Sequence, residues 1–217
     1  GDATGDIHKF TLGLAHASQK YGVQYIYGVQ VSQLKQHAQG VDVIYHASGE
    51  NMHADAHVMQ TICADAIVVC AGVNSYSLSR QLGDRVNIYP VKGYSITVQL
   101  NDTLSQNNAP WVSLLDESAK IVTSRLGKDR LRVAGTAEFN GYNRDIRADR
   151  IQPLIDWVNR NFSLSTEHCI PWTGLRPMMP NMLPVVGRGK RERIFYNTGH
   201  GHLGWTLSAA TAVMVSQ

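Results

Sequence analysis

A glycine-rich turn at residues 199–204, Gly-His-Gly-His-Leu-Gly, constrains this chain more than any other feature. The apolar, β-rich residues 193–197 precede it and predict a short buried strand. Residues 206–215 are rich in alanine and predict a helix. A strand, a G-x-G-x-x-G turn and a helix in this order present backbone N–H groups and a positive helix end to an anionic or electron-rich group.

The position of this turn indicates which part of a fold it builds. A dinucleotide-binding fold normally opens with such a turn, and an acidic residue that binds the ribose follows roughly 20 residues later. Here only residues 205–217 follow the last glycine. We therefore expect the turn to close a cofactor-binding unit, and the chain to be the carboxyl-terminal part of a larger protein.

Composition excludes several classes of protein. The 217 residues can form one large domain or two small ones, and the net charge of +3 is too small to indicate a nucleic-acid partner. No apolar run approaches the roughly 18 residues of a membrane span. Cys63, Cys70 and Cys169 lack C-x-x-C spacing, which favours unpaired thiols over a disulfide scaffold or a zinc site.

The first part of the chain alternates helical and β patterns. Apolar residues recur at helical spacing over residues 7–21, after candidate caps and before Gly22. Residues 23–27, 28–31 and 41–45 predict strands, the last two joined by a turn at Gln39-Gly40, and residues 52–59 alternate weakly. The apolar run 64–70, which includes Cys70 as a buried residue, predicts a central strand of a covered sheet.

The middle of the chain has the pattern of antiparallel β structure. Strands are expected at 88–100, 111–115, 120–125 and 130–136, with a hairpin turn at 127–129. A helical stripe then follows over residues 151–162, with Pro153 in its first turn.

We therefore predict a mixed α/β fold, in which a nucleotide-type α/β part carries an inserted antiparallel sheet. Residues 1–86 and 184–217 would form the cofactor-binding part. Residues 87–183 would form the inserted β domain.

Three further features could carry chemistry. Arg176 lies among apolar residues and prolines, so it either pairs with an internal carboxylate or binds an anionic ligand; its planar guanidinium suits a carboxylate. Ala71-Gly72 follows a predicted strand, where α/β folds place ligands, although a packing glycine is the alternative. His200 and His202 alone do not make a metal site, because no third ligand is near them in sequence.

Several segments together resemble the D-amino-acid oxidase family of flavoproteins, and within it the small subunits of bacterial D-amino acid dehydrogenases. The matching segments keep one order along the whole chain: residues 1–11, 64–75, 89–95, 133–138, 172–177, 183–187 and 199–208. The resemblance implies noncovalently bound FAD. It also implies that residues 1–86 and 184–217 are part of a Rossmann-like FAD-binding domain, and that the inserted residues 87–183 bind the substrate. The family's amino-terminal G-x-G-x-x-G is absent from this sequence, so the resemblance covers roughly the carboxyl-terminal half of such an enzyme, a fragment expected to be inactive alone.

The resemblance also implies residue roles. Arg176 would clamp the substrate carboxylate, with His202, Tyr94 and Tyr142 as further pocket residues, and no catalytic acid or base is identified. The residues implied to contact FAD are Val31, Ala71, Gly72, Gly199, His200, Gly201, His202, Leu203, Gly204, Trp205 and Thr206.

The implied reaction is oxidative deamination of a D-amino acid, such as D-alanine, to a 2-oxo acid and ammonia by hydride transfer to flavin. A respiratory electron acceptor and a cytoplasmic location at the inner face of the bacterial inner membrane would follow, with no nucleic-acid partner and no expectation for oligomeric state. Three alternatives remain: a glycine or sarcosine oxidase, a flavin-dependent tRNA-modification domain of the same fold, and a non-catalytic fragment.

Overall fold

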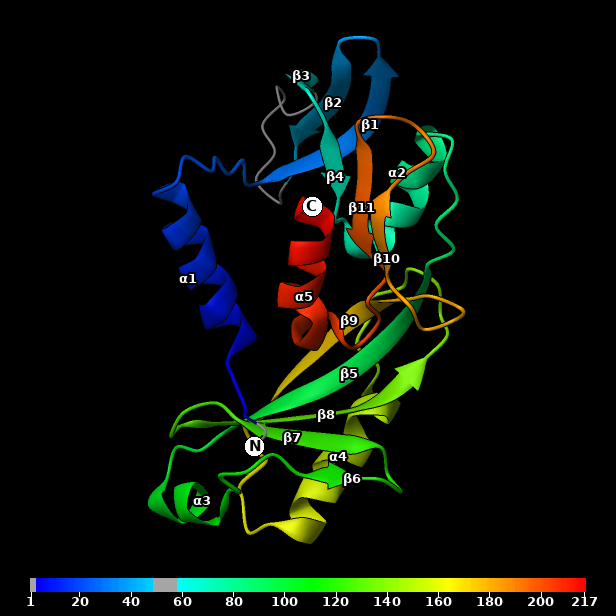
Figure 1. The fold of residues 1–217 in the computed structure, drawn as a ribbon. Coiled ribbons are helices and arrows are strands. Elements are labelled where there is room, and N and C mark those ends of the chain that lie inside the picture. The colour runs from blue at the N-terminus through cyan, green and yellow to red at the C-terminus, as the bar shows by residue number, and fades with distance from the viewer. Residues whose placement is uncertain (1–2, 49–57) are drawn as a thin grey trace. The chain divides into compact units, whose positions relative to one another are not determined.

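The computed structural model describes residues 3–48 and 58–217 (Figure 1). These residues form two compact units. One unit contains the residues up to His16 together with Pro90–Leu175. The other contains Ala17–Tyr89 and Arg176–Gln217. In the described part of the chain, no helix is long and apolar enough to cross a membrane.

The first unit is built on a five-stranded sheet in the order β6-β7-β8-β5-β9. Its strands β5, β6, β7 and β8 form antiparallel pairs that place Ile96 opposite Val133 and Val122 opposite Ala134. The bounds are β5 Tyr89–Gln99, β6 Leu115–Asp116, β7 Ile121–Arg125, β8 Arg130–Glu138 and β9 Ile170–Met178. The hairpin predicted at 127–129 is confirmed, with Gly127 at φ 79°.

Helix α4 (Ala148–Asn161) supplies the core of this unit. Its residues Leu154 and Val158 are fully buried against alternate residues of β5 and β8, as the period-two pattern of the strands requires. Pro153 lies in the second turn of α4 and not in the first as predicted, because the helix begins at Ala148. The short helix α3 (Thr103–Asn108) is capped by Asp102, whose carboxylate accepts a hydrogen bond from Ser105 N at 2.7 Å.

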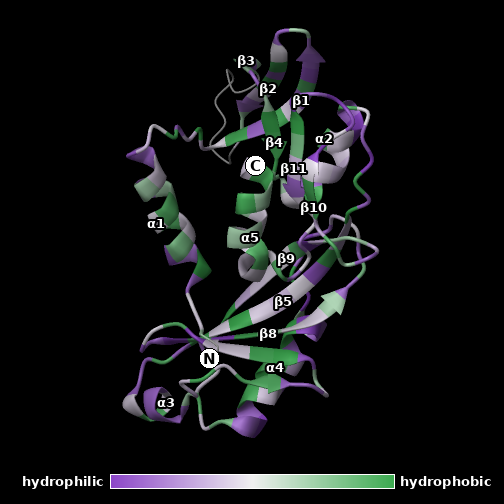
Figure 2. Cartoon of the chain, in the orientation of Figure 1, coloured by the Kyte–Doolittle hydropathy of each residue, from purple (hydrophilic) through white to green (hydrophobic). Residues whose placement is uncertain are grey.

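The second unit contains a three-stranded sheet in the order β10-β11-β4. Strands β10 (Val185–Arg188) and β11 (Ile194–Thr198) are antiparallel, whereas β11 and β4 (Ile67–Val69) run parallel. The turn η2 (Gly72–Asn74) and helix α2 (Ser75–Gln81) follow β4. Helix α5 (Gly204–Ser216) packs against β10 and β11, and it carries apolar residues along its length without any charged one (Figure 2).

The same unit holds a second, antiparallel sheet of β1 (Val29–His37), β2 (Gly40–Ala47) and β3 (Gln60–Ala64), with β2 in the middle. The turn at Gln39-Gly40 is confirmed because it joins β1 to β2. The weak alternation predicted over 52–59 falls partly outside the described residues.

Helix α1 (Ile7–Gln19) begins at a carboxylate cap and ends before a glycine, as predicted. Asp6 Oδ1 accepts hydrogen bonds from His8 N and Lys9 N, and Gly22 has φ 87°. The apolar stripe of the helix stays about half exposed, at 50% for Ile7 and 56% for Leu14.

Three strand predictions were wrong. Residues 23–27 form no strand, because none of them enters a strand ladder in the described part of the chain. Of the strand predicted at 111–115, only Leu115 lies in a strand, β6, because Leu114 N donates to the Thr123 hydroxyl instead of to a backbone carbonyl. The run at 64–70 breaks after Ala64; β4 is an edge strand of its sheet as described, and Cys70 is exposed.

Candidate functional site

Two turns meet at one edge of the sheet in the second unit. Parallel pairing sets Ile67 opposite Ile194 and Val69 opposite Tyr196, so β4 and β11 end on the same side. The chain continues from β4 into Ala71-Gly72 and from β11 into the glycine turn 199–204. The carboxyl edge of parallel strands is where α/β sheets bind ligands.

Hydrogen bonds through two buried hydroxyl groups connect these turns. Thr198, the last residue of β11, donates from Oγ1 to Ser75 Oγ at 2.8 Å. Ser75 Oγ also accepts a hydrogen bond from Ala71 N at 3.0 Å. Because both side chains are buried, the backbone positions of the two turns depend on each other.

The glycine turn adopts a conformation that disfavours other residues. Gly199 and Gly201 have φ of 80° and 59°, in the left-handed region. Gly201 N donates to Pro177 O at 3.0 Å, which holds the turn against a segment of the same unit. A Cβ atom at Gly199 would lie 2.7 Å from Met179 Cγ, so the turn and Met179 are in close contact.

Arg176 lies one residue before the carbonyl that accepts from Gly201, and thus beside the glycine turn along the backbone. Its side chain is half-buried, and burial lowers the pKa of the guanidinium. Desolvation of this kind is offset when an anion approaches the cation. The position therefore suits recognition of a carboxylate.

The two histidines of the turn lie in different surroundings. His200 Nε2 is 3.2 Å from the hydroxyl of Thr211, a buried residue of α5, and burial lowers the pKa of His200. The neutral imidazole is thereby favoured at position 200. His202 is exposed.

Val31 lies where the ladder between β1 and β2 is irregular. The register shifts between Val31 and Gln33, which is a β-bulge. The side chain of Gln81 in α2 stabilises the bulge, because its amide donates to Ser32 O and accepts from Leu34 N. Bulges often occur next to functional sites, where they redirect the backbone.

Tyr94 and Tyr142 belong to the first unit. Tyr94 is buried, and its hydroxyl donates to Glu138 Oε2 at 2.6 Å; Tyr142 is 53% exposed. Lys92 Nζ lies 3.0 Å from the same carboxylate oxygen, and Arg147 donates to Oε1 at 2.8 Å. Hydrogen bonds from Tyr94, Lys92 and Arg147 lower the pKa of Glu138 to about 2.

Sequence reasoning missed the role of Lys92 and Glu138. Spacing cannot pair them, because only the antiparallel register of β5 and β8 sets Lys92 opposite Glu138. The available signal was a lysine within an otherwise β-rich run, where a buried cation needs an anionic partner.

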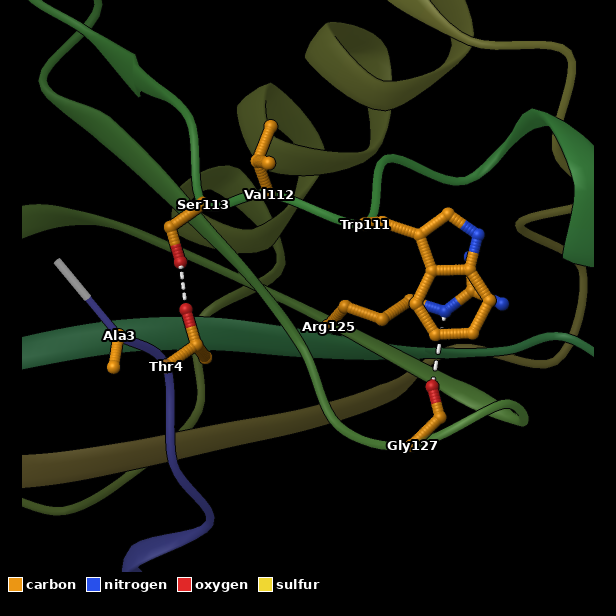
Figure 3. A pocket seen from close by; sticks show the side chains of 7 residues that line it. All are labelled: Ala3, Thr4, Trp111, Val112, Ser113, Arg125 and Gly127. Carbon is orange, nitrogen blue, oxygen red and sulfur yellow. Dashed lines mark hydrogen bonds between the residues drawn. The ribbon is translucent and has the colours of Figure 1, made fainter. Parts of the chain in front are cut away.

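The first unit also has a cavity of about 490 Å³ beside Trp111 and Arg125 (Figure 3). The Arg125 guanidinium lies 4.1 Å from the centre of the Trp111 ring. Its nitrogens donate to the backbone carbonyls of Gln106, Ala109, Gly127 and Lys128. Arg125 therefore stabilises this loop region and has its donors in use.

The residues at the paired turns fit the chemistry of a flavin. Among the described residues, no side chain caps the amino end of α5, so the helix end can face an electron-rich ring edge. A Cβ atom at Gly72 would meet no atom of residues 3–48 and 58–217 within 4 Å, which leaves space beside the turn. These features are backbone features, as close approach to a flat cofactor requires.

Comparison with family models gives a match to FAD dependent oxidoreductases over residues 1–217. The chain belongs to this family. The prediction of FAD-dependent chemistry is confirmed at the level of the family, and so is the resemblance to D-amino acid dehydrogenases.

The similar curated proteins carry that name. The chain is 56% identical over 216 residues to D-amino acid dehydrogenase 3 of Mesorhizobium japonicum, covering 99% of the chain and 50% of that protein. It is 40% identical to D-amino acid dehydrogenase of Cereibacter sphaeroides, covering 100% of the chain and 47% of that protein. The chain thus spans about half the length of the curated relatives it matches.

Solved structures confirm the fold class. Glycine oxidase from Geobacillus kaustophilus matches with a TM-score of 0.75 at 20% identity, over 94% of this chain and 51% of that one. L-proline dehydrogenase from P. horikoshii matches with a TM-score of 0.75 at 13% identity, over 96% and 54% of the two chains. At these identities the similarity concerns the fold alone.

Proposed function

We propose that this chain is part of an FAD-dependent D-amino acid dehydrogenase. The enzyme would oxidise a D-amino acid, such as D-alanine, to an imino acid, which water converts to a 2-oxo acid and ammonia. The observation that carries this proposal is the 56% identity to a D-amino acid dehydrogenase over 99% of the chain.

The cofactor would contact the edge where β4 and β11 end. In this proposal the contact residues are Val31, Ala71, Gly72 and the turn 199–206. Three observations support this: the parallel pairing of β4 and β11, the hydrogen bond from Thr198 to Ser75, and the positive φ of Gly199. Residues 1–86 and 184–217 would then serve FAD, and residues 87–183 the substrate.

Arg176 would bind the α-carboxylate of the substrate through two parallel hydrogen bonds. A planar guanidinium fixes the orientation of a carboxylate as well as its position, so the Cα–H bond is directed the same way in each turnover. The bound flavin would supply the electron acceptor for this bond. The step needs placement more than a protein acid or base, and orientation alone supplies several kcal/mol of barrier reduction.

His202, Tyr94 and Tyr142 are proposed as further pocket residues with unequal support. The exposure of His202 and Tyr142 leaves their side chains accessible to a ligand. The hydroxyl of Tyr94 is already bonded to Glu138, so Tyr94 would act by shaping the pocket wall.

The proposal extends to partners and location. Electrons would pass to a respiratory acceptor, and the protein would be cytoplasmic and meet the inner face of the bacterial inner membrane. No membrane-spanning helix occurs in the described residues, so any such contact through them would be peripheral.

The substitution Arg176→Lys in the full-length enzyme tests the role of Arg176. Lysine keeps the charge and loses the two-pronged geometry, so kcat/KM for D-alanine should fall by about 100-fold, the scale of a misplacement of about 1 Å. Arg160→Lys is the matched control, because Arg160 is exposed at the end of α4. Kinetics of Arg176→Lys equal to those of the control would refute this role.

A glycine or sarcosine oxidase is the second candidate, because such an enzyme would share Arg176 and the glycine turn. Both candidates use a carboxylate clamp, so Arg176→Lys does not separate them. The two candidates are separated by steady-state rates with D-alanine, glycine and sarcosine, each measured with oxygen or an artificial quinone as electron acceptor. A preference for glycine and oxygen would favour the oxidase.

A further inference from the structure

Strand pairing in the second unit gathers three metal-binding side chains that are distant in sequence. His37 ends β1, Asp42 lies in β2 and Cys63 lies in β3. His37 Nε2 is 3.2 Å from Asp42 Oδ1 and 3.7 Å from Cys63 Sγ. One ligand atom from each residue lies within 4.8 Å of the other two.

The register of the sheet explains this cluster. His37 is opposite Gly40 and Asp42 is opposite Cys63, so alternation along β2 directs all three side chains to one face. Gly40 allows β3 to approach β2 closely on that face. A Cβ atom there would lie 2.4 Å from Ala64 O and 3.3 Å from Cys63 Sγ.

We propose that His37, Asp42 and Cys63 bind one divalent zinc-type cation, with water as the fourth ligand. Tetrahedral zinc with bonds of about 2.0 Å to nitrogen and oxygen and about 2.3 Å to sulfur holds its ligand atoms roughly 3.2–3.7 Å apart. The separations of 3.2 and 3.7 Å already match this geometry. One thiolate and one carboxylate balance the two positive charges of the cation.

A fourth residue orients the imidazole. Gln39 contacts His37 Nδ1 twice, because its backbone N–H donates to Nδ1 at 3.3 Å and its Oε1 lies 3.2 Å from the same nitrogen. A cation bound at Nε2 would move the ring proton to Nδ1, where Gln39 Oε1 can accept it. Metal-binding histidines are commonly held in this way through their second nitrogen.

The charges around the cluster suit a cation. The carboxylates of Asp42 and Asp65 act on the Cys63 side chain, and Lys35 lies opposite Asp42 in the ladder. A bound dication would neutralise a Cys63 thiolate and the Asp42 carboxylate together.

The site is distinct from the proposed cofactor edge and would serve a structural role, since it joins all three strands of the β1-β2-β3 sheet. Sequence reasoning argued against zinc because the cysteines lack C-x-x-C spacing and no third ligand lies near His200 and His202 in the sequence. Ligands on neighbouring strands need no fixed sequence spacing, because the register sets their distance.

Zinc binding to the purified protein tests the proposal. We expect one Zn²⁺ per chain in competition with a chromophoric chelator. Cys63→Ser and His37→Gln should abolish binding, and Gln39→Ala should weaken it by about 10-fold or more, as for other supporting residues. Cys70→Ser is the matched control, since it removes another exposed thiol of the same unit and should leave zinc binding unchanged.

A measurement without any variant guards against misfolding. Stoichiometric Zn²⁺ should protect Cys63 from alkylation and leave Cys70 reactive, as read by peptide mass spectrometry. Absence of one-to-one binding, equal binding by Cys63→Ser, or alkylation of Cys63 unaffected by zinc would each overturn the proposal.

Discussion

The substitution Gly199→Ala tests the conformation of the glycine turn. Gly199 has φ 80°, and its missing side chain faces Met179. Alanine adds a single methyl group at the position where β11 enters the turn. Gly141→Ala provides a control with a similar backbone, because Gly141 has φ 54° and no atom lies within 4 Å of its would-be Cβ.

The two substitutions separate backbone strain from overpacking. A left-handed conformation costs an L-residue about 1–2 kcal/mol, and this cost applies to both alanines. At Gly199 the Cβ would lie 2.7 Å from Met179 Cγ. Overpacking of this kind costs a further 1–3 kcal/mol, roughly. We therefore expect Gly199→Ala to lower the free energy of unfolding by about 2–5 kcal/mol, against about 1–2 kcal/mol for Gly141→Ala.

Urea unfolding followed by circular dichroism gives both values. Adding Met179→Ala to Gly199→Ala should recover about 1 kcal/mol or more of unfolding free energy relative to the sum of the single substitutions, because it removes the colliding Cγ and Sδ atoms. Equal destabilisation by Gly199→Ala and Gly141→Ala, with no coupling to Met179, would refute the turn geometry described above.

Two further predictions concern the first unit. Glu138 has a pKa of about 2 against an ordinary value of 4.5, so its stabilising contribution is fully present above about pH 4.5 and is lost as the pH falls towards about 2. Glu138→Gln should therefore flatten the plot of urea midpoint against pH between these values. An unchanged slope in this range would contradict the hydrogen bonds to Glu138 described above. Leu154→Ala, in the fully buried core, should cost about 2–5 kcal/mol of unfolding free energy in the same assay, whereas Leu104→Ala, 65% exposed, should change it by less than about 0.5 kcal/mol; similar losses would contradict the core assignment.

Much of the fold follows from local sequence patterns. The helix at Ala148–Asn161 and the hairpin at Gly127 depend on periodicity and turn chemistry within a few residues, so the sequence predicts them. The break after Ala64 could not be predicted, because Asp65 interrupts an apolar run without a glycine or proline. Residues 23–27 have strand-like composition, but a strand also needs a partner, which composition does not reveal.

The candidate site is predictable where it depends on chain order. The glycine turn follows β11, and Ala71-Gly72 follows β4, so both lie at strand ends in the sequence itself. Their proximity depends on the parallel pairing of two strands from opposite ends of the chain. The Lys92–Glu138 pair and the His37, Asp42 and Cys63 cluster arise from antiparallel register, which a single sequence does not encode in its spacing.

The visible absorption spectrum of the purified full-length enzyme that contains this chain tests the central claim most directly, when it is recorded without oxygen after FAD addition and desalting. We expect a retained flavin band that D-alanine bleaches and L-alanine does not. A protein that retains no flavin, or a retained band that D-amino acids leave unchanged while glycine or sarcosine bleaches it, would contradict a D-amino acid dehydrogenase.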